Sequence, residues 1–128
     1  MKEGQPSVIY LKDYQVPDFL IDKTVLRFEI HDDQTRVISQ LSMRRNPEAA
    51  SMTADLVLNG GPGLTTQAIS IDDRTLLNNE YRITDERLTL SGLPETFELK
   101  TEVCIRPQDN LALSGLYQSG GMFCTQCE

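Results

Sequence analysis

The stretch Phe-Glu-Leu-Lys-Thr-Glu-Val-Cys-Ile, residues 97–105, contains the longest regular alternation of side chains in the sequence. Because successive side chains of a β-strand point to opposite faces, this period of two predicts a strand with one face against a core. The same period occurs at residues 26–30, where Leu26, Phe28 and Ile30 are expected to form the buried face, and again at residues 37–43. The polar residues 32–34 lie between these two runs, which predicts an antiparallel hairpin.

Shorter runs of the same kind fill much of the remaining chain. We expect strands at residues 55–58, 68–71, 81–83 and 88–90, each bounded by polar or glycine-rich turns. The segment Asn-Gly-Gly-Pro-Gly at residues 59–63 cannot lie inside a sheet, and the turn at residues 84–87 predicts a second hairpin. Roughly seven or eight short strands, without helical periodicity, predict an all-β fold, an antiparallel two-sheet β-sandwich. The glycine-rich residues 110–128 are instead expected to form a loop, and they indicate a domain truncated at its C-terminal end.

The composition excludes several classes of function. The 128 residues carry 19 acidic against 12 basic side chains, a formal net charge of -7, and this length suits a single domain. Such a chain lacks the cationic surface that nucleic acids or anionic membranes require, so neither is an expected partner. No apolar run approaches a membrane-spanning length, and the N-terminus lacks the apolar core of a secretory signal. Three cysteines do not make a disulfide framework, which predicts a cytoplasmic protein with reduced thiols.

The single histidine limits the chemistry that the chain can perform alone. His31 lies at the polar end of a predicted strand, and one imidazole cannot form the H-E-x-x-H zinc helix. A Cys–His or Ser–His–Asp arrangement would need His31 beside Cys124, Cys127 or Ser119, and no G-x-S-x-G motif supports it. We therefore predict no catalytic and no metal-ligating residue in this chain.

Two further sequence patterns could indicate a functional site, but each has a simpler structural explanation. Cys124 and Cys127 form a C-x-x-C pair, which could be half of a zinc site, a redox pair or the nucleophile of a thiol enzyme. Without further ligands or a βαβ context, two free thiols are the favoured interpretation. The acidic doublets at residues 32–33, 72–73 and 85–86 do not match the spacing of a calcium loop, and turn chemistry explains them.

Residues 115–128, Gly-Leu-Tyr-Gln-Ser-Gly-Gly-Met-Phe-Cys-Thr-Gln-Cys-Glu, resemble the segment that enters the active site in the bacterial aminopeptidase N family. These enzymes are alanyl aminopeptidases of the gluzincin zinc metallopeptidases. Residues 12–19, 26–29 and 110–113 resemble the same family, so the likeness extends from about residue 10 to residue 128. It implies that residues 1–128 are an N-terminal, saddle-like β-domain that packs on a thermolysin-like catalytic domain of the same polypeptide. It also implies a peptide substrate, and zinc as a cofactor whose ligands lie outside this chain.

The resemblance assigns roles to two residues. Glu128 matches the family glutamate that holds the free α-ammonium group of the substrate, and Gln126 matches a glutamine that lines the pocket for the first side chain. Alternation along an extended segment places both side chains on one side. The zinc helix, the Gly-Ala-Met-Glu-Asn motif and the catalytic tyrosine of the family do not occur here, so the chain alone is not expected to be catalytic.

A stand-alone β-sandwich binding module without enzymatic activity is the alternative. The apolar side chains at residues 116, 117, 122 and 123 discriminate between the two hypotheses. A free-standing module should bury them, whereas an incomplete domain should leave them mobile or paired with another copy. The second case predicts weak self-association through an exposed strand edge.

Overall fold

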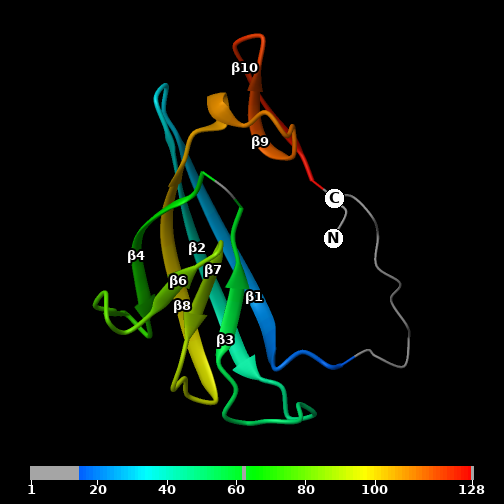
Figure 1. The fold of residues 1–128 in the computed structure, drawn as a ribbon, viewed down its shortest axis with the longest axis vertical. Coiled ribbons are helices and arrows are strands. Elements are labelled where there is room, and N and C mark those ends of the chain that lie inside the picture. The colour runs from blue at the N-terminus through cyan, green and yellow to red at the C-terminus, as the bar shows by residue number, and fades with distance from the viewer. Residues whose placement is uncertain (1–14, 62, 128) are drawn as a thin grey trace.

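The computed structural model describes residues 15–61 and 63–127, which form ten strands in three antiparallel sheets (Figure 1). The strand order is β1-β2-β8-β4-β5 in the five-stranded sheet, β3-β7-β6 in the three-stranded sheet and β9-β10 in the third. The strands are β1 Phe19–Ile30, β2 Thr35–Arg45, β3 Leu56–Asn59, β4 Thr65–Ile71, β5 Arg74–Thr75, β6 Arg82–Thr84, β7 Arg87–Leu90, β8 Thr96–Ile105, β9 Gly115–Ser119 and β10 Met122–Gln126. The prediction of an all-β fold of antiparallel sheets is confirmed.

Helical structure within the described residues is confined to a 3-10 turn, η2, at Pro107–Asp109. No helix in this part of the chain has the length and apolar character needed to span a bilayer.

The alternating stretch at residues 97–105 lies in β8, the central strand of the five-stranded sheet. On one side β8 pairs with β2, where Leu99 lies opposite Leu41, and on the other it pairs with β4, where Thr101 lies opposite Ile69. The predicted hairpin at residues 26–43 is the β1–β2 pair, and the predicted hairpin around residues 84–87 is the β6–β7 pair. Both hairpin predictions are therefore confirmed.

The core lies between the five-stranded and the three-stranded sheet. Its buried apolar side chains come from both sheets and from the residue that follows β5: Met43, Leu56, Ile69, Leu76, Leu90, Phe97 and Leu99. Phe19 closes one end with an edge-on contact to Phe97, their ring centroids 5.9 Å apart. The buried Arg45 guanidinium lies 4.9 Å from the Phe19 ring centroid and donates to the carbonyls of Ala54 and Leu93, each at 3.0 Å. This cation–π contact and the two hydrogen bonds stabilise the guanidinium inside the protein.

The core covers only part of the inner face of the large sheet. Leu26, Phe28 and Ile30, which were predicted to be buried, are 53%, 49% and 47% exposed. Their alternation is correct, because β1 pairs with β2 in regular register over these residues. The prediction of burial was wrong because β3, β7 and β6 have only 4, 4 and 3 residues and end before this half of β1.

The outer face of the large sheet is polar. The Arg36 guanidinium donates to Glu29 at 2.6 Å on one side and to Glu102 at 2.8 Å on the other, linking β1, β2 and β8. The hydrogen bond from Arg36 lowers the pKa of Glu29 below its ordinary value. Further along, the Ser42 hydroxyl donates to Glu98 at 2.6 Å. This face carries the charged residues that a solvent-exposed surface requires.

Two acidic doublets form the central residues of tight turns. Asp72 and Asp73 have φ of 49° and 66°, and Asp85 and Glu86 have φ of 48° and 64°. Two consecutive positive φ values between antiparallel strands are the signature of a type I′ turn, which favours Asn-Gly or Asp-Gly. The Asp72 carboxylate also accepts a hydrogen bond from the Glu98 backbone N–H at 2.9 Å. The acidic residues of these doublets are therefore explained by the turns that they form.

Glu86→Gly is expected to stabilise the protein by about 0.5–1 kcal/mol. A side chain costs roughly 1–2 kcal/mol in the left-handed region, part of which is offset by the greater backbone entropy of glycine in the unfolded chain. The measurement is the urea midpoint of unfolding, with Thr84→Gly in the adjacent strand as the control that should destabilise. A lower midpoint for both variants would show that the turn tolerates glutamate without strain.

Candidate functional site

Residues 115–126 form a hairpin whose strands are β9 and β10. Cys124 lies opposite Tyr117, and Gln126 lies opposite Gly115. The two strands meet at Gly120 and Gly121, with φ of 58° and 80°, which is the type I′ geometry that a Gly-Gly pair adopts readily. The prediction of an irregular loop was therefore wrong for these residues. Each strand has only five residues, and the two strands are separated by two glycines. The alternation of apolar and polar side chains is therefore too short for the sequence to indicate a sheet.

The segment before the hairpin is held by the side chain of Asn110. Its amide nitrogen donates to the carbonyls of Ser114 and Leu116, at 2.8 and 2.9 Å, and its amide oxygen accepts from the Ala112 backbone N–H at 3.1 Å. The enclosed Leu113 has a positive φ of 57°, an uncommon conformation for leucine, which these three hydrogen bonds help to maintain. Sequence reasoning did not assign this role to Asn110.

The root of the hairpin is attached to the tip of the β1–β2 hairpin through η2. Arg106 and Gln108 both donate to the Asp33 carbonyl, at 3.2 and 2.6 Å. Arg106 also pairs with Asp109 at 2.7 Å, and this hydrogen bond raises the pKa of the guanidinium above its ordinary value. β9 contacts β10 and η2, and Figure 1 shows this hairpin at the same end of the molecule as the tip of the β1–β2 hairpin.

Gln126 is the last residue of β10, and its side chain is exposed. Its partner Gly115 has no side chain, so the space beside Gln126 on the neighbouring strand is open. Gln126 shares a face of the hairpin with Cys124 and Met122, as alternation requires. Glu128, the second predicted substrate-binding residue, lies outside the described residues, and its place on the same side as Gln126 stays a prediction.

The remaining predicted candidates are not brought together. His31 is exposed in the turn after β1, where its backbone N–H donates to the Gln34 carbonyl at 3.0 Å. Among the described residues, no hydrogen bond joins its imidazole to Ser119 or to a cysteine. Cys104, Cys124 and Cys127 are free thiols. Within residues 15–61 and 63–127, no group of three or more His, Cys, Asp or Glu side chains could hold a metal ion.

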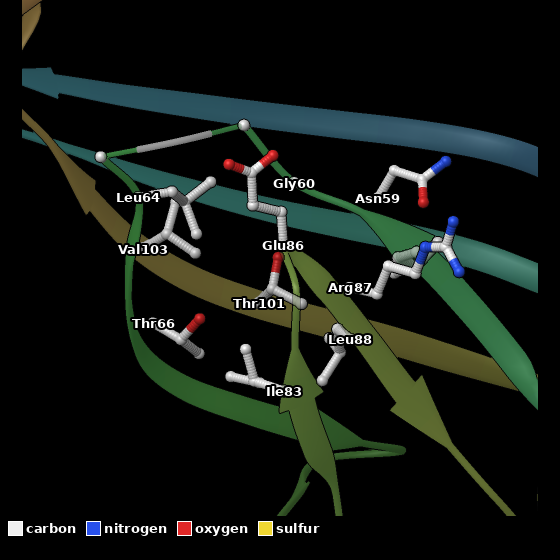
Figure 2. A pocket seen from close by; sticks show the side chains of 13 residues that line it. Asn59, Gly60, Leu64, Thr66, Ile83, Glu86, Arg87, Leu88, Thr101 and Val103 are labelled. Atoms are coloured by element: carbon white, nitrogen blue, oxygen red, sulfur yellow. The ribbon is translucent and has the colours of Figure 1, made fainter. Parts of the chain in front are cut away.

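The structure also contains an apolar hollow that the sequence did not indicate. It has a volume of about 470 Å³ and lies between the two larger sheets, beyond the core. Figure 2 shows side chains from both sheets around it, among them Ile83, Leu88 and Val103, with Asn59, Glu86 and Arg87 also on its wall. Alternation reveals which side chains of a strand face inward, but not how far the opposing sheet extends.

The comparisons with known proteins concern the whole chain. No family model matches it. Aminopeptidase N of Caulobacter vibrioides is 45% identical over 128 residues, all of this chain and 14% of the relative. Aminopeptidase N of Escherichia coli is 38% identical over 97% of this chain and 14% of the relative, and that of Haemophilus influenzae is 34% identical over 93% and 13%. The chain thus spans about one seventh of the length of the relatives it matches.

A solved structure gives the same result for the fold. The crystal structure of Legionella pneumophila aminopeptidase A in complex with aspartic acid superimposes with a TM-score of 0.77 at 25% identity, covering 88% of this chain and 13% of that one. The sequence resemblance and the superposition cover nearly the same residues and point to the same group of enzymes. The chain is homologous to the N-terminal region, about 14%, of bacterial aminopeptidase N.

Proposed function

We propose that this chain is the N-terminal β-domain of a zinc-dependent aminopeptidase that removes N-terminal residues from peptides. The observation that carries the proposal is the identity of 45% to the Caulobacter vibrioides enzyme over all 128 residues. The domain packs on a thermolysin-like catalytic domain of the same polypeptide and contributes to substrate binding. The free thiols agree with a cytoplasmic location, which is likewise a proposal.

In this proposal, the residues at the end of the β9–β10 hairpin bind the substrate. An aminopeptidase must recognise a chain end, and that end carries an amine with a pKa near 7.7–8.0 that is largely protonated at neutral pH. A carboxylate at Glu128 would accept charge-assisted hydrogen bonds from this ammonium. Gln126, exposed beside Gly115, would contact the first residue of the peptide. An acylated peptide lacks the ammonium and would leave the carboxylate desolvated and unpaired.

Zinc is proposed for the rest of the polypeptide. The described residues offer no group of three or more metal-ligating side chains, so their donor set does not fit a zinc site. The contribution of this domain is therefore to position the peptide, and the metal chemistry belongs to the remainder of the enzyme.

The exposure of the hairpin favours this proposal over a stand-alone module. Met122 is 66% exposed and Phe123 is 37% exposed, while Leu116 and Tyr117 are half-buried. A free-standing binding module would be expected to bury its large apolar side chains. A hairpin that lies against a further domain would present them to that domain.

The proposal is tested on the full-length polypeptide, the complete protein of which this chain is the N-terminal region. Hydrolysis of alanine p-nitroanilide and of its N-acetylated form is measured together with zinc content. We expect cleavage of the free-amine substrate alone and loss of activity with a chelator. A protein without zinc and without hydrolysis would favour the binding module instead.

A further inference from the structure

The amide side chain of Asn110 spans the first residue of β9. Its nitrogen donates to the carbonyls on both sides of Gly115, those of Ser114 and Leu116, at 2.8 and 2.9 Å. Its oxygen accepts from the Ala112 backbone N–H at 3.1 Å. Since an asparagine side chain has two N–H donors and one acceptor oxygen, both polar atoms of this amide are engaged. The half-buried Asn110 side chain is therefore held in one orientation, and it fixes the point at which the hairpin begins.

Asn110 is itself attached to the rest of the domain. Its backbone N–H donates to the Pro107 carbonyl at 3.1 Å and closes η2. The hydrogen bonds of Arg106 and Gln108 to the Asp33 carbonyl attach η2 to the tip of the β1–β2 hairpin. Asn110 therefore joins an anchored segment to the start of the β9–β10 hairpin.

This connection extends across the hairpin to Gln126. Strand register places Gly115 opposite Gln126 and Leu116 opposite Thr125. The two carbonyls that Asn110 binds therefore lie at the same end of the hairpin as Gln126. In the described part of the chain, the main contacts of the hairpin are between β9 and β10 and between β9 and η2. A change at Asn110 would consequently be transmitted through β9 to Gln126.

The loop enclosed by these hydrogen bonds has an unfavourable backbone conformation. Leu113 has a φ of 57° and Gly115 a φ of 74°. A leucine stays in the left-handed region only where the surrounding contacts hold it there. Without the Asn110 amide, we expect Leu113 to relax to a negative φ, which would change the direction in which the chain enters β9. The hydrogen bonds of Asn110 thus hold the orientation of the hairpin as well as its starting point.

We propose that Asn110 is a positioning residue for the peptide substrate, acting through Gln126 and the residues that follow it. The inference rests on the proposed function, because it requires that the end of the β9–β10 hairpin binds the peptide. A hairpin that swings about its root presents Gln126 in the binding position for only part of the time, and the apparent affinity falls by that fraction. Once the peptide is bound, the hairpin is in place and the chemical step is unaffected. Loss of the Asn110 amide should therefore raise KM and leave kcat nearly unchanged.

The test is steady-state hydrolysis of alanine p-nitroanilide by the full-length polypeptide. Asn110→Ala is expected to raise KM about tenfold, while kcat stays within about twofold of the wild type. Asn110→Asp keeps the acceptor for the Ala112 N–H but loses both donors, so it should raise KM at least as much. A lower kcat at unchanged KM, the pattern of a partly unfolded enzyme, would overturn the inference. A wild-type KM in Asn110→Asp would overturn it as well, because the donors to Ser114 and Leu116 would then be dispensable.

Asn46→Ala is the matched control. The Asn46 side chain has a similar bonding pattern, since its oxygen accepts from the Glu48 backbone N–H at 3.0 Å and its nitrogen donates to the Pro17 carbonyl at 2.9 Å. Asn46 follows the last residue of β2, whereas η2 follows β8 at the end that pairs with the start of β2. Asn46→Ala should therefore lower stability without a change in KM. An equal rise in KM for Asn46→Ala would show that KM responds to any loosened loop, and would contradict the proposal.

Hydrogen exchange, measured by mass spectrometry on the same variants, tests the connection to the hairpin. Asn110→Ala should accelerate exchange severalfold in peptides covering residues 115–126 and leave residues 97–105 of β8 unchanged. Unchanged exchange in the hairpin would overturn the inference. The two proposals fail in different ways. A wild-type protein without hydrolysis refutes the proposed function and with it the role of Asn110, whereas an active wild type whose KM is unaffected by both Asn110 variants refutes the role of Asn110 alone.

Discussion

Glu128→Gln in the full-length polypeptide is expected to lower kcat/KM for substrates with a free α-amine by about 10- to 100-fold. The neutral amide keeps the size of the side chain and its oxygen can still accept a hydrogen bond, but the negative charge that pairs with the α-ammonium is lost, and hydrogen bonds to charged groups contribute roughly 1.5–3 kcal/mol. At about 1.4 kcal/mol per factor of ten, this gives the stated range. The measurement is steady-state kinetics on alanine p-nitroanilide, with zinc content determined for both proteins.

The controls separate recognition of the amine from general damage to the site. Cys127→Ser changes the intervening residue, which is exposed and alternates to the other side of an extended segment, and it should leave kcat/KM nearly unchanged. The N-acetylated substrate should remain uncleaved with either glutamate or glutamine at residue 128. Unaltered kinetics in Glu128→Gln would remove this residue from the site, and a loss of zinc would show that the variant disturbs the metal centre.

Leu99→Ala is expected to destabilise the protein by about 3 kcal/mol. Leu99 is 0% exposed at the centre of β8, between Leu41 of β2 and Ile71 of β4. Replacement of a fully buried leucine by alanine costs the transfer free energy of the lost atoms and the cavity that remains, typically 2–5 kcal/mol. Urea unfolding at constant temperature measures the change.

Lys100→Ala provides the matched comparison, because the exposed Lys100 is the next residue of β8 and points to the polar face. A surface substitution of this kind usually changes stability by less than about 0.5 kcal/mol. A loss of under about 1 kcal/mol for Leu99→Ala would mean that the two sheets do not pack tightly over β8. Equal losses for both variants would indicate that strand propensity, rather than core packing, determines the result.

The sequence predicted those features that depend on neighbouring residues. The regular period at residues 97–105 identified β8, and polar turns identified the β1–β2 and β6–β7 hairpins, because alternation and turn chemistry are local. It did not predict that Phe28 is half-exposed, since burial depends on which other strands extend over it. The β9–β10 hairpin was missed although its Gly120-Gly121 turn is a recognised hairpin signal.

The residues of the candidate site were predicted mainly from the resemblance to a known family, and only to a small extent from physical arguments about the sequence. Gln126 follows a run of Met, Phe, Cys and Thr that has no charge pattern or spacing of its own, so only the likeness to aminopeptidase N indicated a role. Asn110 was overlooked because its importance depends on three backbone groups that the folded loop brings together. The apolar hollow between the sheets arises from strand lengths, which periodicity does not determine.

The attachment of the β9–β10 hairpin through η2 has a consequence for the order of folding. An isolated two-stranded hairpin is at best marginally stable in water, and this one contacts the rest of the described protein mainly through Pro107–Asp109. Its amide hydrogens should therefore exchange with solvent long before those of β8, whose opening requires unfolding of the large sheet. If the hairpin recognises chain ends, as proposed, the folding chain acquires that ability only after the large sheet to which the hairpin is attached has formed.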